Sequence, residues 1–400
     1  MRCLVAIWFS VLTVLVTPPL HASRPAGIAV VVEVTHVDTN RWRVDYRFSQ
    51  PVTSIKFEPV GDYRAQAWKM VTPGLRLRSD ADFDVISAGG KPFNSARVDI
   101  TTFDSLPPKQ YAAFNRFSDG GMAMFLGHLQ GNAYQGKTSS DMLTDIRVKG
   151  LRDENVIAPP LNKATPGGPR GYAYFGPSTA VPRGNALVLI DPQLPVWVRD
   201  TLLNSGDKLA QYYEKAYRRA LGDKLFIIAS VSDLKQPVFS ITGGAVLGQL
   251  SYRFEGQQIL ADHPKKREML TRMVAHEMAH VWQMNLKRGG AGDSDPWIHE
   301  GGAEAMALDG LLHTGAASME SVAAYRAAQT AVCDKLGNSV DTYDGIYACG
   351  LVRFDKTGVD AVTMWRSLMA MTEEKGEVYS PHMVEAVRAA HGSPAAPAGQ

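Results

Sequence analysis

The sequence has little charge imbalance, few cysteines and no apolar run long enough to span a bilayer. Its 42 Lys and Arg and 40 Asp and Glu leave a formal net charge of +2, which points neither to nucleic acid nor to a membrane surface as a partner. The apolar run at residues 4–16 is shorter than the ~20 residues of a membrane-spanning helix, so we expect no stable membrane insertion. We find no internal repeat and no long low-complexity segment except the tail, residues 392–400, which we expect to be disordered. The composition is that of a globular protein.

The first 22 residues have the parts of a secretory signal peptide. Arg2 precedes the apolar run, and small residues follow it at Ala22 and Ser23. Cys3 lies ahead of the run and not after the cleavage site, which argues against a lipid anchor. We therefore predict an exported protein, periplasmic or secreted.

Two cysteines remain after the signal peptide, Cys333 and Cys349. In an oxidising compartment such a pair favours a disulfide, which stabilises by ~3 kcal/mol for a loop of this size. Two free buried thiols are the alternative.

Residues 23–195 alternate apolar and polar side chains, the pattern of strands. It is strictest at residues 42–48, where Trp42, Val44, Tyr46 and Phe48 share one face. Gly, Pro, Asn and Asp separate further candidate strands at residues 28–34, 52–57, 83–86, 96–100, 122–129 and 186–190. The sequence predicts a β-rich N-terminal domain that resembles a sandwich.

Residues 196–391 have mostly helical periodicity. An amphipathic helix at 197–221 precedes a strand at 224–230 and one or two strands at 238–254. Later helices are expected at residues 319–336, 346–356, 359–374 and 382–390. The predicted fold is α+β, with a β-rich domain followed by a mostly helical one.

The strongest motif is His276-Glu277-x-x-His280, in a stretch with no Gly or Pro to interrupt a helix. On a helix, residues four apart lie ~6 Å apart on one face, so both imidazoles can bind one ion. Chance spacing on a surface helix is the alternative. The flanking residues are mostly apolar, however, and two adjacent buried imidazoles need a partner, for which a metal ion is the best candidate.

A third ligand lies on a helix that we expect to begin at Pro296, after the N-cap residue Asp295. Glu300 is the predicted ligand. Glu304, one turn later, is placed to accept the free N–H of one histidine and fix its tautomer. His299 competes with Glu300, but it projects about 100° away, which suits a substrate-side or structural role.

Two glycines follow Glu300 inside the same helix. Gly301 and Gly302 each cost ~1 kcal/mol relative to Ala, which indicates that another element approaches closely. The helix of His276 is the candidate for that element.

These residues resemble a gluzincin, the metallopeptidase group that includes thermolysin and the aminopeptidase N-like enzymes. Glu300 follows His280 by 20 residues, with a second glutamate four further on, as in the thermolysin-like pair of ligand and orienting carboxylate. The segment 299–304 is similar to the Asn-Glu-Gly-Phe-Ala stretch of aminopeptidase N-like enzymes. A metzincin would need Gly at position 283 and His at 286, where the chain has Gln283 and Leu286. The resemblance implies a thermolysin-like catalytic domain.

The resemblance also implies the chemistry. One Zn²⁺ held by His276, His280 and Glu300 would polarise a peptide carbonyl and acidify a bound water, from which Glu277 takes a proton. We predict a zinc metallopeptidase that acts on peptides or proteins. The alternative is an exported binding or scaffold protein with an inert zinc site. The intact Glu277 speaks against it, because a structural zinc needs no base.

In the thermolysin-like family, the edge strand before the zinc helix pairs with the substrate backbone, and glycines there permit close approach. Gly243, Gly244 and Ala245 are the matching candidates, although a bulge or hairpin explains the glycines equally well. Aminopeptidase N-like enzymes carry here a glutamate that holds the substrate's free amine, but this chain has Leu247. Glu255 could substitute for it. Aminopeptidase and endopeptidase action therefore both stay open.

Tyr347 begins a Tyr-x-x-Gly sequence similar to the Tyr-Glu-Lys-Gly stretch of aminopeptidase N-like enzymes. There the tyrosine donates a hydrogen bond to the oxyanion of the tetrahedral intermediate, a role worth ~3 kcal/mol. A packing role for Tyr347 is equally consistent with the sequence, and Tyr343 or Tyr325 could take its place.

Overall fold

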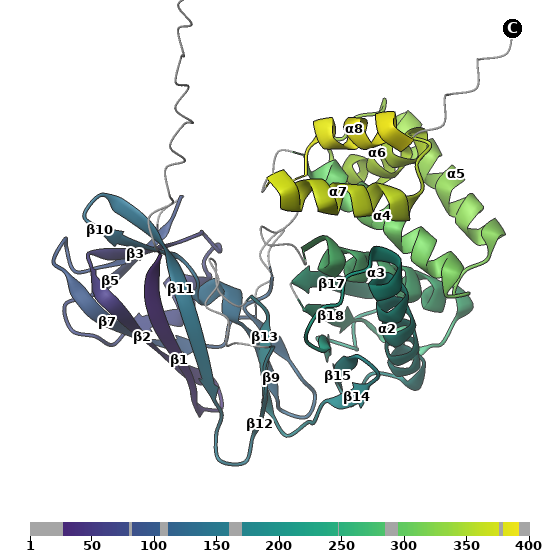
Figure 1. The fold of residues 1–400 in the computed structure, drawn as a ribbon. Coiled ribbons are helices and arrows are strands. Elements are labelled where there is room, and N and C mark those ends of the chain that lie inside the picture. The colour runs from purple at the N-terminus through teal and green to yellow at the C-terminus, as the bar shows by residue number, and fades with distance from the viewer. Residues whose placement is uncertain are drawn as a thin grey trace, which may run out of the picture.

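The structure, a computed structural model, describes residues 27–79, 82–104, 111–159, 170–246, 248–284, 295–375 and 379–391. The predicted signal peptide, the predicted tail and Leu247 lie outside these residues. A β-rich N-terminal domain and a mostly helical C-terminal domain stand side by side, as the sequence predicts (Figure 1). None of the described helices is long and apolar enough to cross a membrane.

A nine-stranded sheet forms the outer part of the N-terminal domain. Its strands are β1 (Ile28–Asp38), β2 (Arg41–Val52), β3 (Ser54–Phe57), β4 (Trp68–Met70), β5 (Arg76–Ser79), β6 (Asp84–Ser87), β7 (Phe93–Thr101), β10 (Asn132–Gln135) and β11 (Thr138–Lys149), and the short helix α1 (Tyr63–Ala67) connects β3 to β4. Across the sheet the strands run β4-β7-β2-β1-β11-β10-β3-β6-β5. In β2 the side chains of Trp42, Val44 and Tyr46 are fully buried and those between them are not, which confirms the predicted face.

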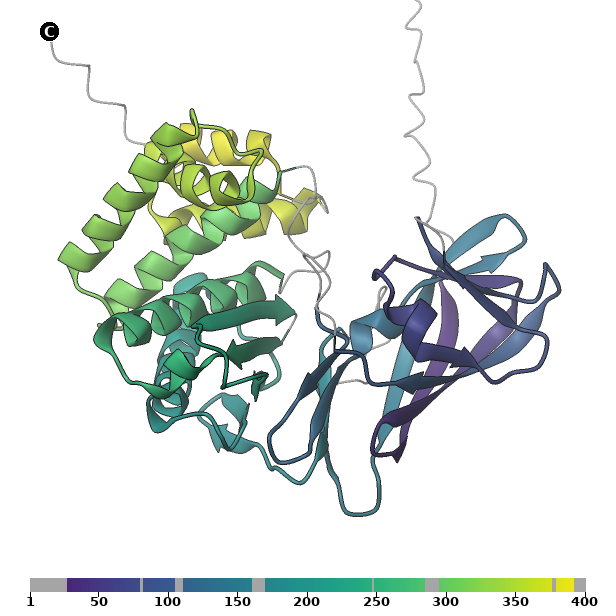
Figure 2. The ribbon, with the colours of Figure 1, turned by 180° about the vertical axis from the view of Figure 1, so that it is seen from behind.

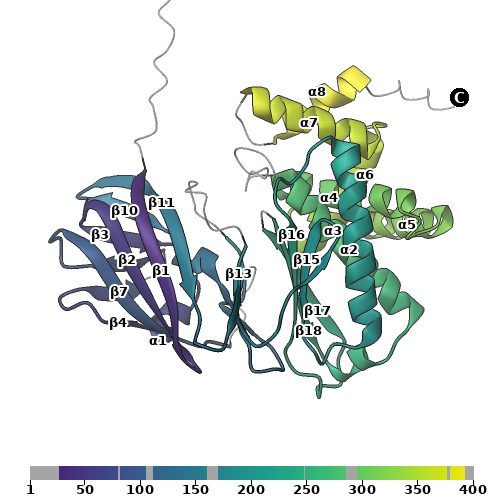
Figure 3. The ribbon, with the colours of Figure 1, turned by 60° about the horizontal axis from the view of Figure 1, so that its bottom comes forward.

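A four-stranded sheet lies between the outer sheet and the C-terminal domain (Figure 3). It is built from β8 (Phe114–Arg116), β9 (Met122–Phe125) with the 3-10 turn η1 (Leu126–Leu129), β12 (Asn155–Ile157) and β13 (Tyr172–Gly176). Phe114 and Phe175 join the core of the outer sheet, whereas Phe125 and Tyr174 join a cluster with Phe226 of the C-terminal domain. Strand β13 is buried along its whole length because both faces of its sheet are covered.

The C-terminal domain contains a five-stranded sheet of β14 (Val181–Arg183), β15 (Ala186–Ile190), β16 (Leu225–Val231), β17 (Ser240–Val246) and β18 (Gln249–Glu255). Their order is β14-β15-β16-β18-β17. Strand β15, which the periodicity assigns to the N-terminal domain, pairs in parallel with β16 of the C-terminal domain. That placement is corrected: a parallel pair needs a long crossover, here a helix, and strand periodicity does not reveal which sheet a strand joins.

Helices cover the face of this sheet that is turned away from the N-terminal domain. Leu225 and Ile227 of β16 face the helices, and Phe226 and Ile228 face the four-stranded sheet. Seen from behind, the last helices, green to yellow, lie above the sheet (Figure 2). The helical elements are α2 (Val196–Tyr217), η2 (Gln257–Leu260), α3 (Pro264–Met284), α4 (Pro296–His313), α5 (Met319–Lys335), α6 (Tyr343–Lys356), α7 (Ala361–Lys375) and α8 (Pro381–His391).

Helix α4 crosses α6 with backbone against backbone. A Cβ built on Gly301 would lie 2.7 Å from the backbone nitrogen of Leu351 and closer still to Gly350, and one built on Gly350 would lie 2.9 Å from Cα of Gly301. Gly302 faces the ring of Trp365 in α7. The predicted close approach is present, but the helix of His276 was the wrong partner. Glycines on both α4 and α6 let those two backbones meet instead.

Cys333 of α5 and Cys349 of α6 form a disulfide. This confirms the predicted pair. The bond ties α5 to the helix that carries Tyr347.

Candidate metal centre

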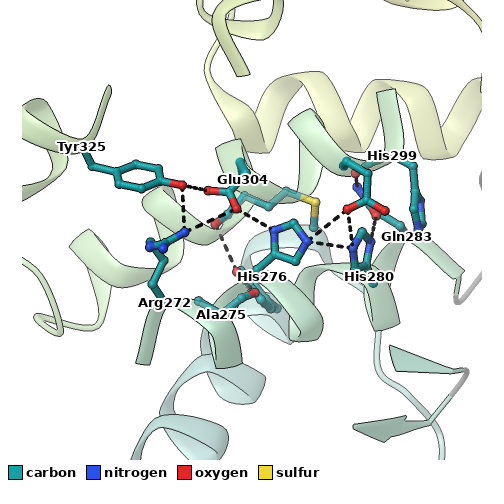
Figure 4. A network of polar contacts seen from close by, with 11 residues as sticks. Arg272, Ala275, His276, His280, Gln283, His299, Glu304 and Tyr325 are labelled. Atoms are coloured by element: carbon teal, nitrogen blue, oxygen red, sulfur yellow. Dashed lines mark hydrogen bonds and ion pairs between the residues drawn. The ribbon is translucent and has the colours of Figure 1, made fainter. Parts of the chain in front are cut away.

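Helix α3 directs two buried imidazoles at one point, and α4 directs a carboxylate at the same point. The Nε2 atoms of His276 and His280 lie 3.0 Å apart (Figure 4). An Oε2 atom of Glu300 lies 3.2 Å from each of them. Within the described part of the chain, this is the group whose ligand atoms could hold a metal ion, since all lie within 4.8 Å of one another. Two imidazoles and one carboxylate suit zinc.

Each ring is held through its other nitrogen (Figure 4). The Nδ1 atom of His276 lies 3.0 Å from a carboxylate oxygen of Glu304, and Nδ1 of His280 lies 2.8 Å from the side-chain oxygen of Gln283. The amide of Gln283 is oriented because its N–H donates to the carbonyl of His299. While both rings are neutral, these acceptors place the proton on each Nδ1, and both Nε2 lone pairs face the carboxylate and each other. Three electron-pair donors that converge in this way fit a cation.

Glu304 is itself supported by two residues. Tyr325 donates its hydroxyl to Glu304 at 2.9 Å, and Arg272 lies 3.6 Å from the other carboxylate oxygen while donating to the Tyr325 hydroxyl at 2.7 Å. Burial raises the pKa of Glu304, but the hydrogen bond to His276 and the charge of Arg272 outweigh it, so the pKa is lowered. Glu304 is thus an ionised acceptor, positioned where the sequence predicts an orienting carboxylate.

The surrounding carboxylates make the site favour positive charge. Burial by itself lowers the pKa of His276. Hydrogen bonds to Glu300 and Glu304 outweigh this effect and raise the pKa to about 10. Burial likewise raises the pKa of Glu300, and hydrogen bonds to His276 and His280 bring it below its usual range. A divalent cation between these groups would supply the positive charge that the carboxylates stabilise.

Glu277 lies on α3 beside the edge strand β17. A Cβ built on Gly243 would lie 3.0 Å from its Oε1 atom, so the glycine leaves room for the carboxylate. Burial raises the pKa of Glu277, and the charges of His276 and His280 offset this only in part. A carboxylate with a raised pKa is suited to act as a general base.

Strand β17, which contains Gly243, Gly244 and Ala245, is the edge strand of its sheet and forms an antiparallel hairpin with β18, so both interpretations of the glycines hold. Glu255, the candidate to replace the missing acid, pairs with Ser240 at the start of β17. That pair lies three residues from Gly243, ~10 Å along the strand. Glu255 is therefore remote from the glycines.

Tyr347 is the candidate tyrosine that lies against the imidazole of His276. Its ring centre is 5.6 Å from that of His276 and 5.1 Å from that of Tyr343. Burial raises the pKa of Tyr347, and the charge of Glu300 adds to the rise, so the phenol stays protonated and able to donate. Tyr325 is engaged with Glu304 instead, and Tyr343 is 66% exposed. The oxyanion role stays a prediction for Tyr347.

His299 is not one of the converging ligands. Its ring stacks on that of His280, with centres 4.1 Å apart and planes inclined by 21°. Burial and the charge of His280 lower the pKa of His299 well below its usual value, so it stays neutral.

Sequence reasoning missed two residues of the site. Gln283 is not predicted as a site residue from the sequence. Its spacing of three from His280 nevertheless places the two side chains on one helix face. Tyr111 reaches β17 from the N-terminal domain, where its hydroxyl donates to the carbonyl of Ala245. Nothing in the sequence around Tyr111 indicates this contact, because its partner lies 134 residues later in the chain.

A scan against models of protein families and a search of curated proteins find no match for this sequence. Solved structures do match, at low sequence identity. An aminopeptidase N family protein from Idiomarina loihiensis matches with a TM-score of 0.60 and 9% identity, over 89% of this chain and 72% of its own. A mutant M1 zinc metallopeptidase from Deinococcus radiodurans, bound to a Tyr-Ser-Ala substrate, matches with a TM-score of 0.50 and 13% identity, over 92% of this chain and 90% of its own. Yeast LTA4 hydrolase in complex with bestatin matches with a TM-score of 0.51 and 10% identity, over 90% of this chain and 64% of its own.

At such identities the likeness establishes the fold, and function has to be argued from the site. The structural neighbours are zinc aminopeptidases of the M1 family, gluzincins with a thermolysin-like catalytic domain, and the chain has their two-domain fold.

Proposed function

We propose that this protein is an exported zinc peptidase that hydrolyses peptide bonds in peptides or proteins. The observation that carries the proposal is the convergence of His276 Nε2, His280 Nε2 and Glu300 Oε2, with the opposite nitrogen of each ring held by an acceptor. Three protein ligands of these types are usual in catalytic zinc sites, which keep a further position for water or substrate. The fold shared with M1 zinc peptidases, one of them bound to a peptide, supports the assignment.

Each residue around a bound zinc ion would have its own role in hydrolysis. Zinc held by the three ligands would act as a Lewis acid toward the peptide carbonyl and lower the pKa of a water to ~7. Glu277 would take a proton from the attacking water and deliver it to the leaving amine nitrogen. Tyr347 would donate its phenol O–H to the oxyanion that develops. The backbone of β17 at Gly243 would hold the substrate in an extended conformation.

Export is part of the proposal. Residues 1–22 have the parts of a signal peptide, and the Cys333–Cys349 disulfide suits an oxidising compartment. Peptide mapping of the protein recovered outside the cytoplasm should find the amino terminus at Ser23. A terminus at Met1 there would speak against cleavage.

Metal analysis combined with a mixed peptide library tests the peptidase. We expect one zinc ion per purified chain, hydrolysis of library peptides by mass spectrometry, loss of hydrolysis with a chelator and recovery with added zinc. Bound zinc without any hydrolysis would favour a binding or scaffold protein with an inert site. A purified protein that binds no zinc would exclude both the zinc peptidase and the scaffold protein with an inert zinc site.

Glu304→Gln should weaken zinc binding without removing a ligand. The neutral amide accepts a weaker hydrogen bond from His276 Nδ1 than the carboxylate that stands there at 3.0 Å. We expect zinc affinity to fall about 10–100-fold, measured by competition with a chromogenic chelator. Glu268→Gln, at an exposed position of α3, is the control and should bind zinc like the wild type. Equal affinity in the two variants would contradict the orienting role.

A further inference from the structure

Strand β17 turns alternate backbone groups toward its outer edge. The carbonyls of Gly248 and Phe254 accept hydrogen bonds from the β16 side, so even-numbered residues of β18 turn their backbone groups toward β16. Gly243 and Ala245 of β17 lie opposite even-numbered residues of β18. Their N–H and C=O groups therefore point away from β18, to the outer edge, where an extended substrate could pair with them.

The hydroxyl of Tyr111 occupies one of these outer positions. It donates a hydrogen bond to the carbonyl of Ala245 at 2.6 Å. The ring covers the preceding residue, since a Cβ built on Gly244 would lie 2.8 Å from Tyr111 Cε1. Tyr111 thus blocks the edge strand at Ala245 and lies over the face of Gly244.

Packing in the N-terminal domain holds Tyr111 in place. Its ring stacks on that of Phe125 in β9, with centres 4.5 Å apart and planes inclined by 19°. Tyr172 of β13 donates its hydroxyl to the carbonyl of Ala112, the next residue in the chain, at 2.8 Å. The four-stranded sheet itself packs on β15 and β16. Tyr111 is therefore a fixed part of the interface between the two domains.

The free position on the edge lies beside the metal centre. Gly243 points its backbone groups outward, and its α-carbon lies next to Glu277, so a peptide paired with Gly243 passes the proposed base. The next outward carbonyl, ~7 Å along the strand, is the one that Tyr111 has bonded. We infer that Tyr111 is a specificity-determining residue, which closes the edge strand so that substrate extends only about two residues past the metal centre on that side. The inference rests on the proposed peptidase.

Peptides of stepwise length test this role. A sequence cut in the mixed library is made as internally quenched peptides, lengthened one residue at a time at the amino end in one set and at the carboxyl end in another. For the zinc-loaded full chain we expect kcat/KM to fall about ten-fold or more beyond about two residues, at one end only. Tyr111→Ala should remove most of that loss, and Tyr111→Phe, which keeps the ring, should remove part of it. Tyr134→Phe, in β10, is the matched control and should keep the wild-type length profile.

The outcomes separate the inference from the peptidase on which it rests. Equal cleavage of all lengths by the wild type, or an unchanged length limit in folded Tyr111→Ala, would overturn the role of Tyr111 and leave the peptidase standing. If Tyr111→Ala does not fold, the profile of Tyr111→Phe decides, and an unchanged limit counts against the inference. Absence of hydrolysis of any peptide by the zinc-loaded wild type would overturn the peptidase and the inference together.

Discussion

Replacing Glu277 by Gln is expected to lower kcat/KM for peptide hydrolysis by about 10²–10⁴-fold while zinc stays bound. Glutamine nearly preserves the shape of the side chain, but its amide cannot take up the proton of the attacking water. Glu277 is not one of the converging donors, so metal binding should not depend on it. Initial rates on a peptide cut by the wild type, measured beside the zinc content of the same samples, check both parts.

Two features of Glu277 make this the sharpest test of the chemistry. Its raised pKa gives a more basic carboxylate than an exposed glutamate has, and Gly243 leaves it space beside the edge strand. Glu268→Gln changes an exposed glutamate of the same helix and should leave rate and zinc content unaltered. Activity within a few-fold of wild type in Glu277→Gln would assign the base elsewhere. A parallel loss of zinc would make Glu277 a ligand.

The ligands could be predicted because most of their geometry is local. The spacing of His276 and His280 gives one helix face, and the same spacing places Glu300 and Glu304 one turn apart. The resemblance to gluzincins supplied the remaining step, that the two helices meet. The structure brings these four side chains together as expected, with Glu304 on the outer nitrogen of His276.

Contacts between elements could not be predicted in the same way. A glycine such as Gly301 shows that something approaches its helix, but only tertiary packing decides that the neighbour is α6. The strand at residues 186–190 has the same periodicity in either domain. Tyr111 meets Ala245 across 134 residues, and nothing in its neighbours in sequence marks the contact.

Gly301→Ala is expected to destabilise the protein although alanine is the better helix former. Helix propensity alone would raise the free energy of unfolding by ~1 kcal/mol. The added methyl would lie 2.7 Å from the backbone nitrogen of Leu351 in α6, and a backbone cannot turn aside as a side chain can. Overpacking typically costs ~1–3 kcal/mol, and we place this site at the upper end, for a net loss of about 2 kcal/mol in urea unfolding followed by circular dichroism.

The same substitution should lower the kcat/KM of the folded protein, because the crossing places Tyr347 of α6 beside the ligands on α3 and α4. Gly310→Ala, also in α4, is the matched control. The three atoms nearest its methyl would be side-chain atoms of Tyr213 and Leu209, at 3.0 to 3.1 Å, which need to shift by only a few tenths of an ångström. We expect its unfolding free energy to stay within about 1 kcal/mol of wild type, with unchanged kcat/KM. If Gly301→Ala is as stable as Gly310→Ala, the backbone contact between α4 and α6 does not determine how these helices cross. The position of Tyr347 then depends on the side chains around it.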